Sequence, residues 1–179
     1  METLKCNFNE TNNTFTMEDD VVKYIFKNIR KNEDNTFSYD VEFIDFGIFT
    51  HKAFKLLDED MKVSSSNYFN SLLDLINKTK GHNPKDDNNR WATIKSMNEL
   101  DCLRVAKNNT TNDNVVEYST IRGRSDWKNQ FDFRILFYEG IESKYSKTSY
   151  IFRATPDDLD SLSKEISKLI GFTSLSKKG

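Results

Sequence analysis

Hydrophobic and polar residues alternate most regularly in the last third of the chain. Phe131, Phe133, Ile135 and Phe137 occupy every second position, which is typical of a strand with one buried face. After a polar turn, residues 148–153 predict a second strand. This segment therefore predicts a β-sheet.

An amphipathic run after the second strand predicts a helix over residues 157–170 that packs on the sheet. Its apolar stripe consists of Leu159, Leu162, Ile166, Leu169 and Ile170. Thr155 is placed to cap this helix, and Pro156 fits its first position. Gly171 is expected to end the helix in a left-handed conformation.

Residues 37–81 follow a similar order of strand and helix. Residues 37–43 alternate between aromatic or aliphatic and polar side chains, which predicts a half-buried strand that breaks at residues 44–47. The three serines at residues 64–66 precede an apolar helix face made of Phe69, Leu72, Leu73 and Ile76. Gly81 would end this helix.

Residues 16–32 fit two structures. Val22, Ile25, Phe26 and Ile29 follow helical spacing, and we favour a helix that Thr16 caps. The β-branched and aromatic content also allows a strand.

Three weaker signals complete the predicted elements. Residues 4–17 are expected to form a hairpin that turns at residues 9–13. Residues 102–107 and 115–121 are expected to form strands joined by a long loop, and the polar segment 82–90 to form a linker or mobile loop.

Together the elements predict an α+β fold, mainly an antiparallel β-sheet with two or three amphipathic helices packed on one face. The length of 179 residues suits a single domain over residues 1–179. The pattern also allows two β-rich subdomains, residues 1–81 and 91–175, joined by the loop 82–90.

The composition argues for a folded chain with an aromatic core. Charged residues make up 30%, but aromatic residues reach 13% and include 14 Phe, which a disordered chain would lack. The net charge of -2 gives no overall attraction to nucleic acid or to an anionic membrane. Frequent Asn, Lys and Ile with only 6 Gly and 2 Pro are typical of an AT-rich genome, such as that of a bacterium, its phages, or some viruses and protists.

The sequence lacks the common catalytic and cofactor motifs. It contains no G-x-G-x-x-G, no P-loop and no G-x-S-x-G. Cys6, Cys102, His51 and His82 do not have metal-ligand spacing, so we predict no metal site and no cofactor. No apolar run has the length of a membrane span, and no signal peptide is visible, so we expect a cytoplasmic protein without membrane contact.

Carboxylates on one predicted strand raise the possibility of a nuclease. Asp40, Glu42 and Asp45 lie on or near this strand, and Glu142 and Lys144 form an E-x-K. Metal-dependent nucleases use such groups to hold Mg²⁺ and to position the attacking water. The E-x-K falls in a predicted turn, however, and Asp40 and Glu42 alternate with apolar residues as on the wet face of a strand.

The candidate binding site is a basic and aromatic segment. It consists of Arg122, Arg124, Trp127, Lys128 and Arg134. On an exposed loop, the arginines could bind phosphates or a carboxylate-rich protein surface, and Trp127 could stack on a base or fill a partner's pocket. The alternative is a loop with solvated charges and a tryptophan in the core.

A second basic group lies on the first predicted helix. It consists of Lys23, Lys27, Arg30 and Lys31, and the first three of these would line up opposite the apolar stripe. Such a face is usually solvated, and contact with a partner is the less favoured interpretation.

These observations predict a non-enzymatic intracellular protein that binds another protein, as an accessory or inhibitory factor of a phage or mobile element. The first alternative is a nucleic-acid-binding module that uses the basic and aromatic segment. The second is a divergent metal-dependent nuclease. The missing motifs weigh against an enzyme without excluding one, because catalytic groups can assemble in space. The oligomeric state cannot be read from the sequence.

Overall fold

The computed structural model describes residues 2–46, 61–79, 115–124, 130–139 and 146–176. A five-stranded sheet is built, in spatial order, from β1 (Lys5–Asn9), β2 (Thr14–Glu18), β3 (Val22–Lys31), β4 (Phe37–Asp45) and β5 (Met61–Ser66). A three-stranded sheet is built from β6 (Val115–Arg124), β7 (Gln130–Glu139) and β8 (Ser146–Ala154). Helix α1 (Tyr68–Thr79) follows β5, and helix α4 (Pro156–Ser176) follows β8.

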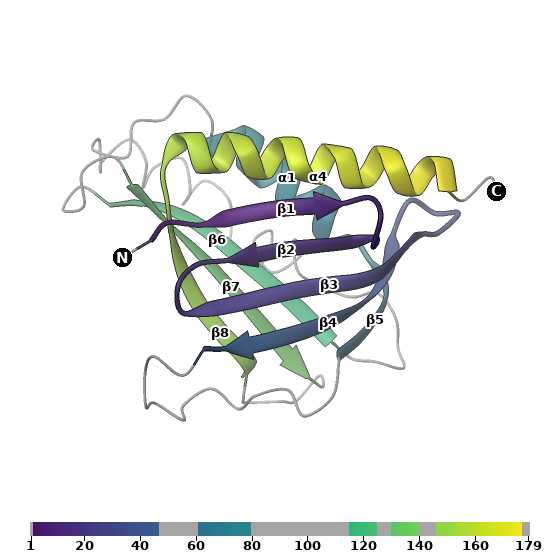
Figure 1. The fold of residues 1–179 in the computed structure, drawn as a ribbon, viewed down its shortest axis with the longest axis horizontal. Coiled ribbons are helices and arrows are strands. Elements are labelled where there is room, and N and C mark those ends of the chain that lie inside the picture. Colours follow the sequence, from purple (N-terminus) through teal and green to yellow (C-terminus); the bar gives the residue numbers. More distant parts are fainter. Residues whose placement is uncertain (1, 47–60, 80–114, 125–129, 140–145, 177–179) are drawn as a thin grey trace.

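The predicted α+β class is confirmed, because every neighbouring strand pair is antiparallel and both described helices are amphipathic. The strands divide between two sheets rather than forming one. Figure 1 shows the five-stranded sheet in front and the three-stranded sheet behind it, with strands that cross at a steep inclination. Helix α4 runs alongside β1, and α1 lies behind it.

Aromatic side chains fill the core between these layers. Phe69 of α1 packs against four rings of the five-stranded sheet, those of Phe15, Phe26, Phe37 and Tyr39, at centroid distances of 5.1 to 5.7 Å. Tyr24 of β3 meets Phe152 of β8 edge-on at 6.1 Å and so joins the two sheets. The expected aromatic core is thus present and buries rings from both sheets.

Hydrogen bonds between distant segments tie the layers together. The amide of Leu4 donates to the carbonyl of Arg153 at 2.7 Å, which links the start of the chain to β8. The hydroxyl of Tyr150 donates to Asp19 at 2.5 Å. The hydroxyls of Tyr68 on α1 and Ser119 on β6 lie 2.7 Å apart and are buried.

The helix predicted over residues 16–32 is wrong, because β2 and β3 occupy this segment. Val22, Tyr24 and Phe26 alternate into the core, and Ile25 lies on the opposite, half-buried face. A β-bulge at Asn28, whose φ is 54°, then inserts one extra residue. Ile29 therefore returns to the core three residues after Phe26, and the shift in phase imitates helical spacing.

Several local predictions are confirmed. The hairpin over residues 4–17 forms as β1 and β2, and β4 ends at Asp45 as expected. Thr155 caps α4: its Oγ1 accepts a hydrogen bond of 3.1 Å from the amide of Asp158, whose Oδ2 accepts one of 2.8 Å from the amide of Thr155.

Other boundaries differ from the prediction. Gly171 does not end α4, which continues to Ser176. The serines at residues 64–66 precede α1 as expected, and they form the end of β5; the amide of Tyr68 donates to Ser66 Oγ at 3.1 Å. The segments 82–90 and 102–107, together with Gly81, lie outside the described residues.

Candidate functional site

Polar side chains on the outward face of the five-stranded sheet lie in rows that run across the strands. The strand register aligns Lys5, Glu18, Lys23 and Ile44 in one row, Asn7, Thr16, Ile25 and Glu42 in the next, and Asn9, Thr14, Lys27, Asp40 and Lys62 in a third. The alternate residues point into the core. One face of the sheet is therefore a broad surface of mixed charge.

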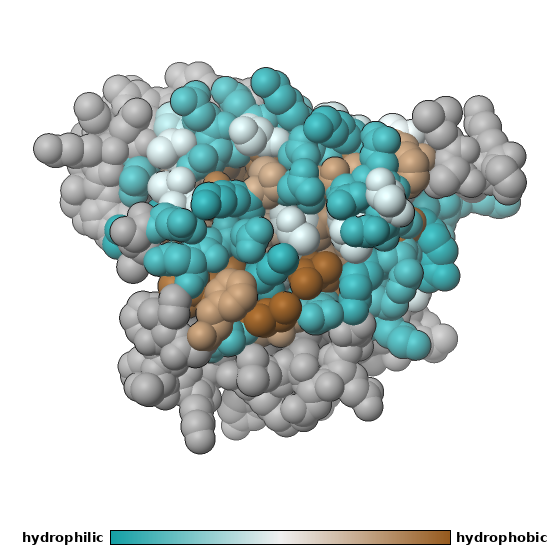
Figure 2. Space-filling view, in the orientation of Figure 1, coloured by the Kyte–Doolittle hydropathy of each residue, from teal (hydrophilic) through white to brown (hydrophobic). Residues whose placement is uncertain are grey.

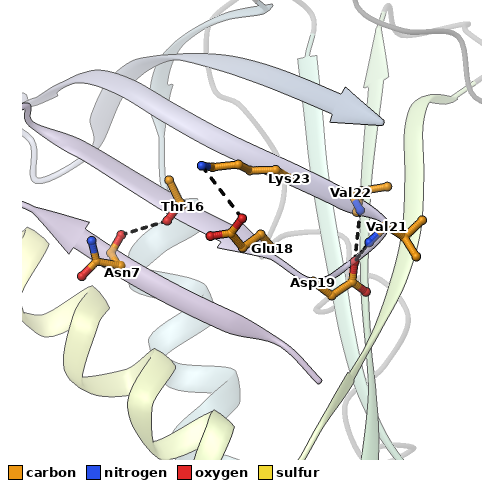
Figure 3. Close-up of polar contacts among 7 residues, drawn as sticks. All are labelled: Asn7, Thr16, Glu18, Asp19, Val21, Val22 and Lys23. Carbon is orange, nitrogen blue, oxygen red and sulfur yellow. Dashed lines mark hydrogen bonds and ion pairs between the residues drawn. The ribbon is translucent and has the colours of Figure 1, made fainter. Parts of the chain in front are cut away.

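Ion pairs neutralise several of these charges. Lys27 Nζ lies 2.9 Å from Glu42 Oε1, and Lys23 Nζ lies 3.9 Å from Glu18 Oε2. Figure 3 shows Lys23 and Glu18 reaching toward each other from neighbouring strands. Such half-exposed pairs contribute little to stability, about 0–1 kcal/mol, so they chiefly fix the charge pattern of the face.

Apolar residues gather at one end of this face. Ile25 and Ile44 are half-buried diagonal neighbours on β3 and β4, and Phe46 follows directly after β4 with 49% of its surface exposed. The amide of Phe46 donates to the carbonyl of Val21 at 2.9 Å, which fixes this position. We call Ile25, Ile44 and Phe46 the sheet patch. Figure 2 shows apolar residues together on this face, with hydrophilic residues above and beside them.

A hollow of about 490 Å³ opens elsewhere on the five-stranded sheet. Its lining residues are Asn13, Asn28, Arg30, Asp40, Lys62, Val63 and Ser64. We call it the bulge hollow, because β3 carries an extra residue at Asn28 and β5 carries another beside Ser64. The residues that line it come from the β1–β2 turn and from three strands.

The predicted binding residues are only partly described. Arg122 and Arg124 belong to β6, so the exposed loop expected for them is wrong: β6 runs on to Arg124 and pairs there with Gln130 of β7. Arg134 lies half-buried on β7, and no described residue offers its buried Nε a hydrogen-bond partner. Trp127 and Lys128 lie outside the described residues, and the binding role of this segment remains a prediction.

The second basic group lies on β3 rather than on a helix. Lys23, Lys27 and Arg30 still lie away from the core, because the bulge returns Arg30 to the outward face. Lys23 and Lys27 are engaged in the ion pairs described above, whereas Arg30 has no ion-pair partner among the described residues.

The acidic residues considered for a nuclease do not form a cluster where the structure describes them. Asp40 and Glu42 lie on the outward face of β4, as predicted for a wet face. Within the described ranges, no group of three or more His, Cys, Asp or Glu side chains could hold a metal ion. Glu142, Lys144, His51, His82 and Cys102 lie outside these ranges.

Asp19 has a structural role that the sequence did not suggest. It is buried and accepts hydrogen bonds from the amides of Val21 and Val22 at 2.8 and 3.0 Å, as Figure 3 shows, and from Tyr150. Burial, the hydrogen bond to Asp19 and the charge of Asp19 raise the pKa of Tyr150 well above its usual value. This carboxylate therefore holds the β2–β3 turn against β8.

Cys6 on β1 is a poor nucleophile. Burial, followed by the charges of Glu165 and Asp158, raises the pKa of Cys6 to about 12. Because the thiolate is the reactive form, this cysteine has little chemistry to offer near neutral pH.

In the part of the chain that the structure describes, no helix has the length and hydrophobicity of a membrane span. Comparison with protein-family models, with curated proteins and with solved structures gave no match.

Proposed function

We propose that this protein is a non-enzymatic binding protein that covers an acidic surface of another protein with the outward face of its five-stranded sheet. The observation that carries the proposal is the sheet patch with Phe46 half exposed at its margin. Protein interfaces combine an apolar centre with a polar, solvent-accessible rim. The sheet patch and the charged rows beside it offer this combination.

The charge of the face favours an acidic partner. On its strands, basic side chains outnumber acidic ones: Lys5, Lys23, Lys27, Arg30 and Lys62 against Glu18, Asp40 and Glu42. The whole chain carries a net charge of -2, so this excess of positive charge is local. A local field of this kind speeds association with a surface of opposite charge. The proposal retains an intracellular, accessory or inhibitory role, as for a phage or mobile-element protein.

Substitution of Phe46 tests the proposal. The partner is first captured from the native host after nuclease treatment and purified, and its affinity is then measured by calorimetry. Phe46→Ser should weaken binding about tenfold or more, as loss of an interface anchor does. Ile151→Ser is the matched control, because Ile151 is 48% exposed but lies on β8 of the other sheet. Equal affinities for Phe46→Ser and the unmodified protein would refute the proposal.

Binding of nucleic acid remains the first alternative, with Arg122, Arg124, Trp127, Lys128 and Arg134 as its residues. It predicts affinity for a single-stranded oligonucleotide that falls steeply between about 50 and 200 mM salt. Absence of binding at the low-salt end would exclude it. The nuclease alternative predicts a Mg²⁺-dependent cleavage that Glu142→Gln abolishes.

A further inference from the structure

The bulge hollow lies between two irregularities that flank β4. On one side, Asn28 and Ile29 of β3 together oppose Tyr39. On the other side, β5 has an extra residue between Val63 and Ser66, which pair with Tyr39 and Phe37. A bulge bends its strand and changes the direction of the side chains beside it, and bulges are frequent next to binding sites. Two bulges that face each other across one strand open a concave place in the sheet.

Positive charge is available at this place. Arg30 on β3 and Lys62 on β5 both line the hollow and are both exposed. Neither forms an ion pair with any described residue. Lys27 and Lys23 of the same sheet are already paired with glutamates. The two cations in the hollow are therefore free to bind the oxygens of an anionic group.

Hydrogen-bonding groups lie between these two cations. Asp40 on β4 lines the hollow, and its Oδ2 accepts a hydrogen bond of 3.0 Å from the side-chain amide of Asn28. The Asp40 carboxylate would repel a bare anion, but it can accept hydrogen bonds from hydroxyl groups. Asn28 and Ser64 add further polar groups to the lining. The hollow thus suits a molecule with an anionic end and several hydroxyls.

We propose that the bulge hollow binds a phosphorylated sugar, either free or as the sugar–phosphate unit of a nucleotide. Arg30 and Lys62 bind the phosphate, and Asp40 accepts hydrogen bonds from the sugar hydroxyls. The volume of about 490 Å³ falls in the range of about 300–1,000 Å³ that small-molecule sites occupy, and it exceeds the needs of a single ion. The hollow lies on the same face of the sheet as the proposed protein interface, but the Lys27–Glu42 ion pair lies between it and the sheet patch.

Calorimetric titration with ribose 5-phosphate, ribose, inorganic phosphate and adenosine 5′-monophosphate tests the proposal. Ribose 5-phosphate should bind at low salt, and ribose and inorganic phosphate should each bind about tenfold more weakly, because each offers only part of the chemistry. A stronger affinity for adenosine 5′-monophosphate would identify the ligand as a nucleotide, whereas a weaker one would identify it as a free sugar phosphate.

Variants of the hollow complete the test. Arg30→Gln and Lys62→Gln should each weaken ribose 5-phosphate binding about tenfold, as loss of a charge-assisted hydrogen bond does. Lys5→Gln, which removes an exposed lysine from β1 of the same face, should have no effect. The proposal fails if ribose 5-phosphate does not bind at about 10 mM, which corresponds to a negligible affinity. It also fails if inorganic phosphate binds equally well, or if Arg30→Gln and Lys62→Gln both bind like the unmodified protein. Ribose 5-phosphate binding is measured in the absence of any protein partner, so its outcome is separate from that of partner capture.

Discussion

Glu165 on α4 accepts a hydrogen bond of 3.0 Å from the backbone amide of Phe8 on β1. Strand β1 is the outermost strand of the five-stranded sheet on this side, so an amide on its outer edge has no neighbouring strand to pair with. An open edge of this kind invites pairing with another chain, and proteins often cover it with a helix. Here α4 covers the edge, and one of its side chains satisfies the amide.

We expect Glu165→Ala to lower the free energy of unfolding by about 1–3 kcal/mol, because it leaves a partly buried amide without a partner. Glu165→Gln should cost less, since its side-chain oxygen can still accept the hydrogen bond. Urea denaturation of both variants measures the difference. Equal losses for alanine and glutamine would contradict the role given to the acceptor.

Acid should weaken the same contact. Burial by itself would raise the pKa of Glu165, but the hydrogen bonds from Lys168 and Phe8 and the charge of Lys168 lower it overall. Because the pKa of Glu165 is lower in the folded state, the carboxylate adds to the free energy of unfolding above the unfolded-state pKa of about 4.5. This contribution is lost as the pH falls through the folded-state pKa. Between about pH 6 and pH 3, the unmodified protein should therefore lose stability more steeply than Glu165→Gln.

Tyr150 should make the protein sensitive to alkali. Burial and Asp19 raise the pKa of Tyr150 in the folded state. Its contribution to the free energy of unfolding is therefore present below the unfolded-state pKa of about 10 and is lost as the pH rises above that value. In Tyr150→Phe, the stability at neutral pH should fall by about 1–3 kcal/mol, because Asp19 loses a donor. The loss of stability between about pH 9 and pH 11 should then be shallower than in the unmodified protein. Identical slopes for the two proteins would show that Tyr150 does not titrate as described.

Cys6 should resist thiol reagents. In a Cys102→Ser background, its reaction with Ellman's reagent at about pH 8 should be at least ~30-fold slower than that of free cysteine, because a pKa near 12 leaves very little thiolate. Addition of denaturant should restore the ordinary rate. A folded protein that reacts as fast as free cysteine would disprove the burial of this thiol.

Gly171→Ala should stabilise the protein. Gly171 lies inside α4, is exposed, and has no atom within 4 Å of the position that a Cβ would take. Alanine in a helix interior is favoured over glycine by about 1 kcal/mol, which thermal or urea unfolding can resolve. A loss of stability would indicate that the chain does not remain helical at this residue.

The elements predicted correctly are those whose signals are local. Alternation from Phe37 to Phe43 identified β4, and Thr155 with Pro156 marked the start of α4. Gly171 misled the prediction, because the glycine penalty in a helix is small beside the packing of Leu169 and Thr173, which are buried on either side of it.

The site could not be predicted in the same way. The bulge hollow brings together Arg30, Asp40 and Lys62 from three strands, and their proximity depends on strand register rather than on spacing in the sequence. The sequence pointed to Arg30 and Asp40 separately, in a basic group and among the carboxylates, and it favoured the basic residues near Arg122, whose side chain the structure does not describe.

By itself, the sequence determined the class of fold, because the two-residue period of strands and the apolar stripes of helices follow from the geometry of a single element. The tertiary structure alone decided that β3 is a strand, because the bulge at Asn28 is defined by its pairing with β4. It also decided the role of Asp19, whose partner Tyr150 lies 131 residues away along the chain. Contacts between distant segments produce no periodic pattern in the sequence. In this protein they determine the strand register, the covering of the β1 edge by α4, and the bulge hollow.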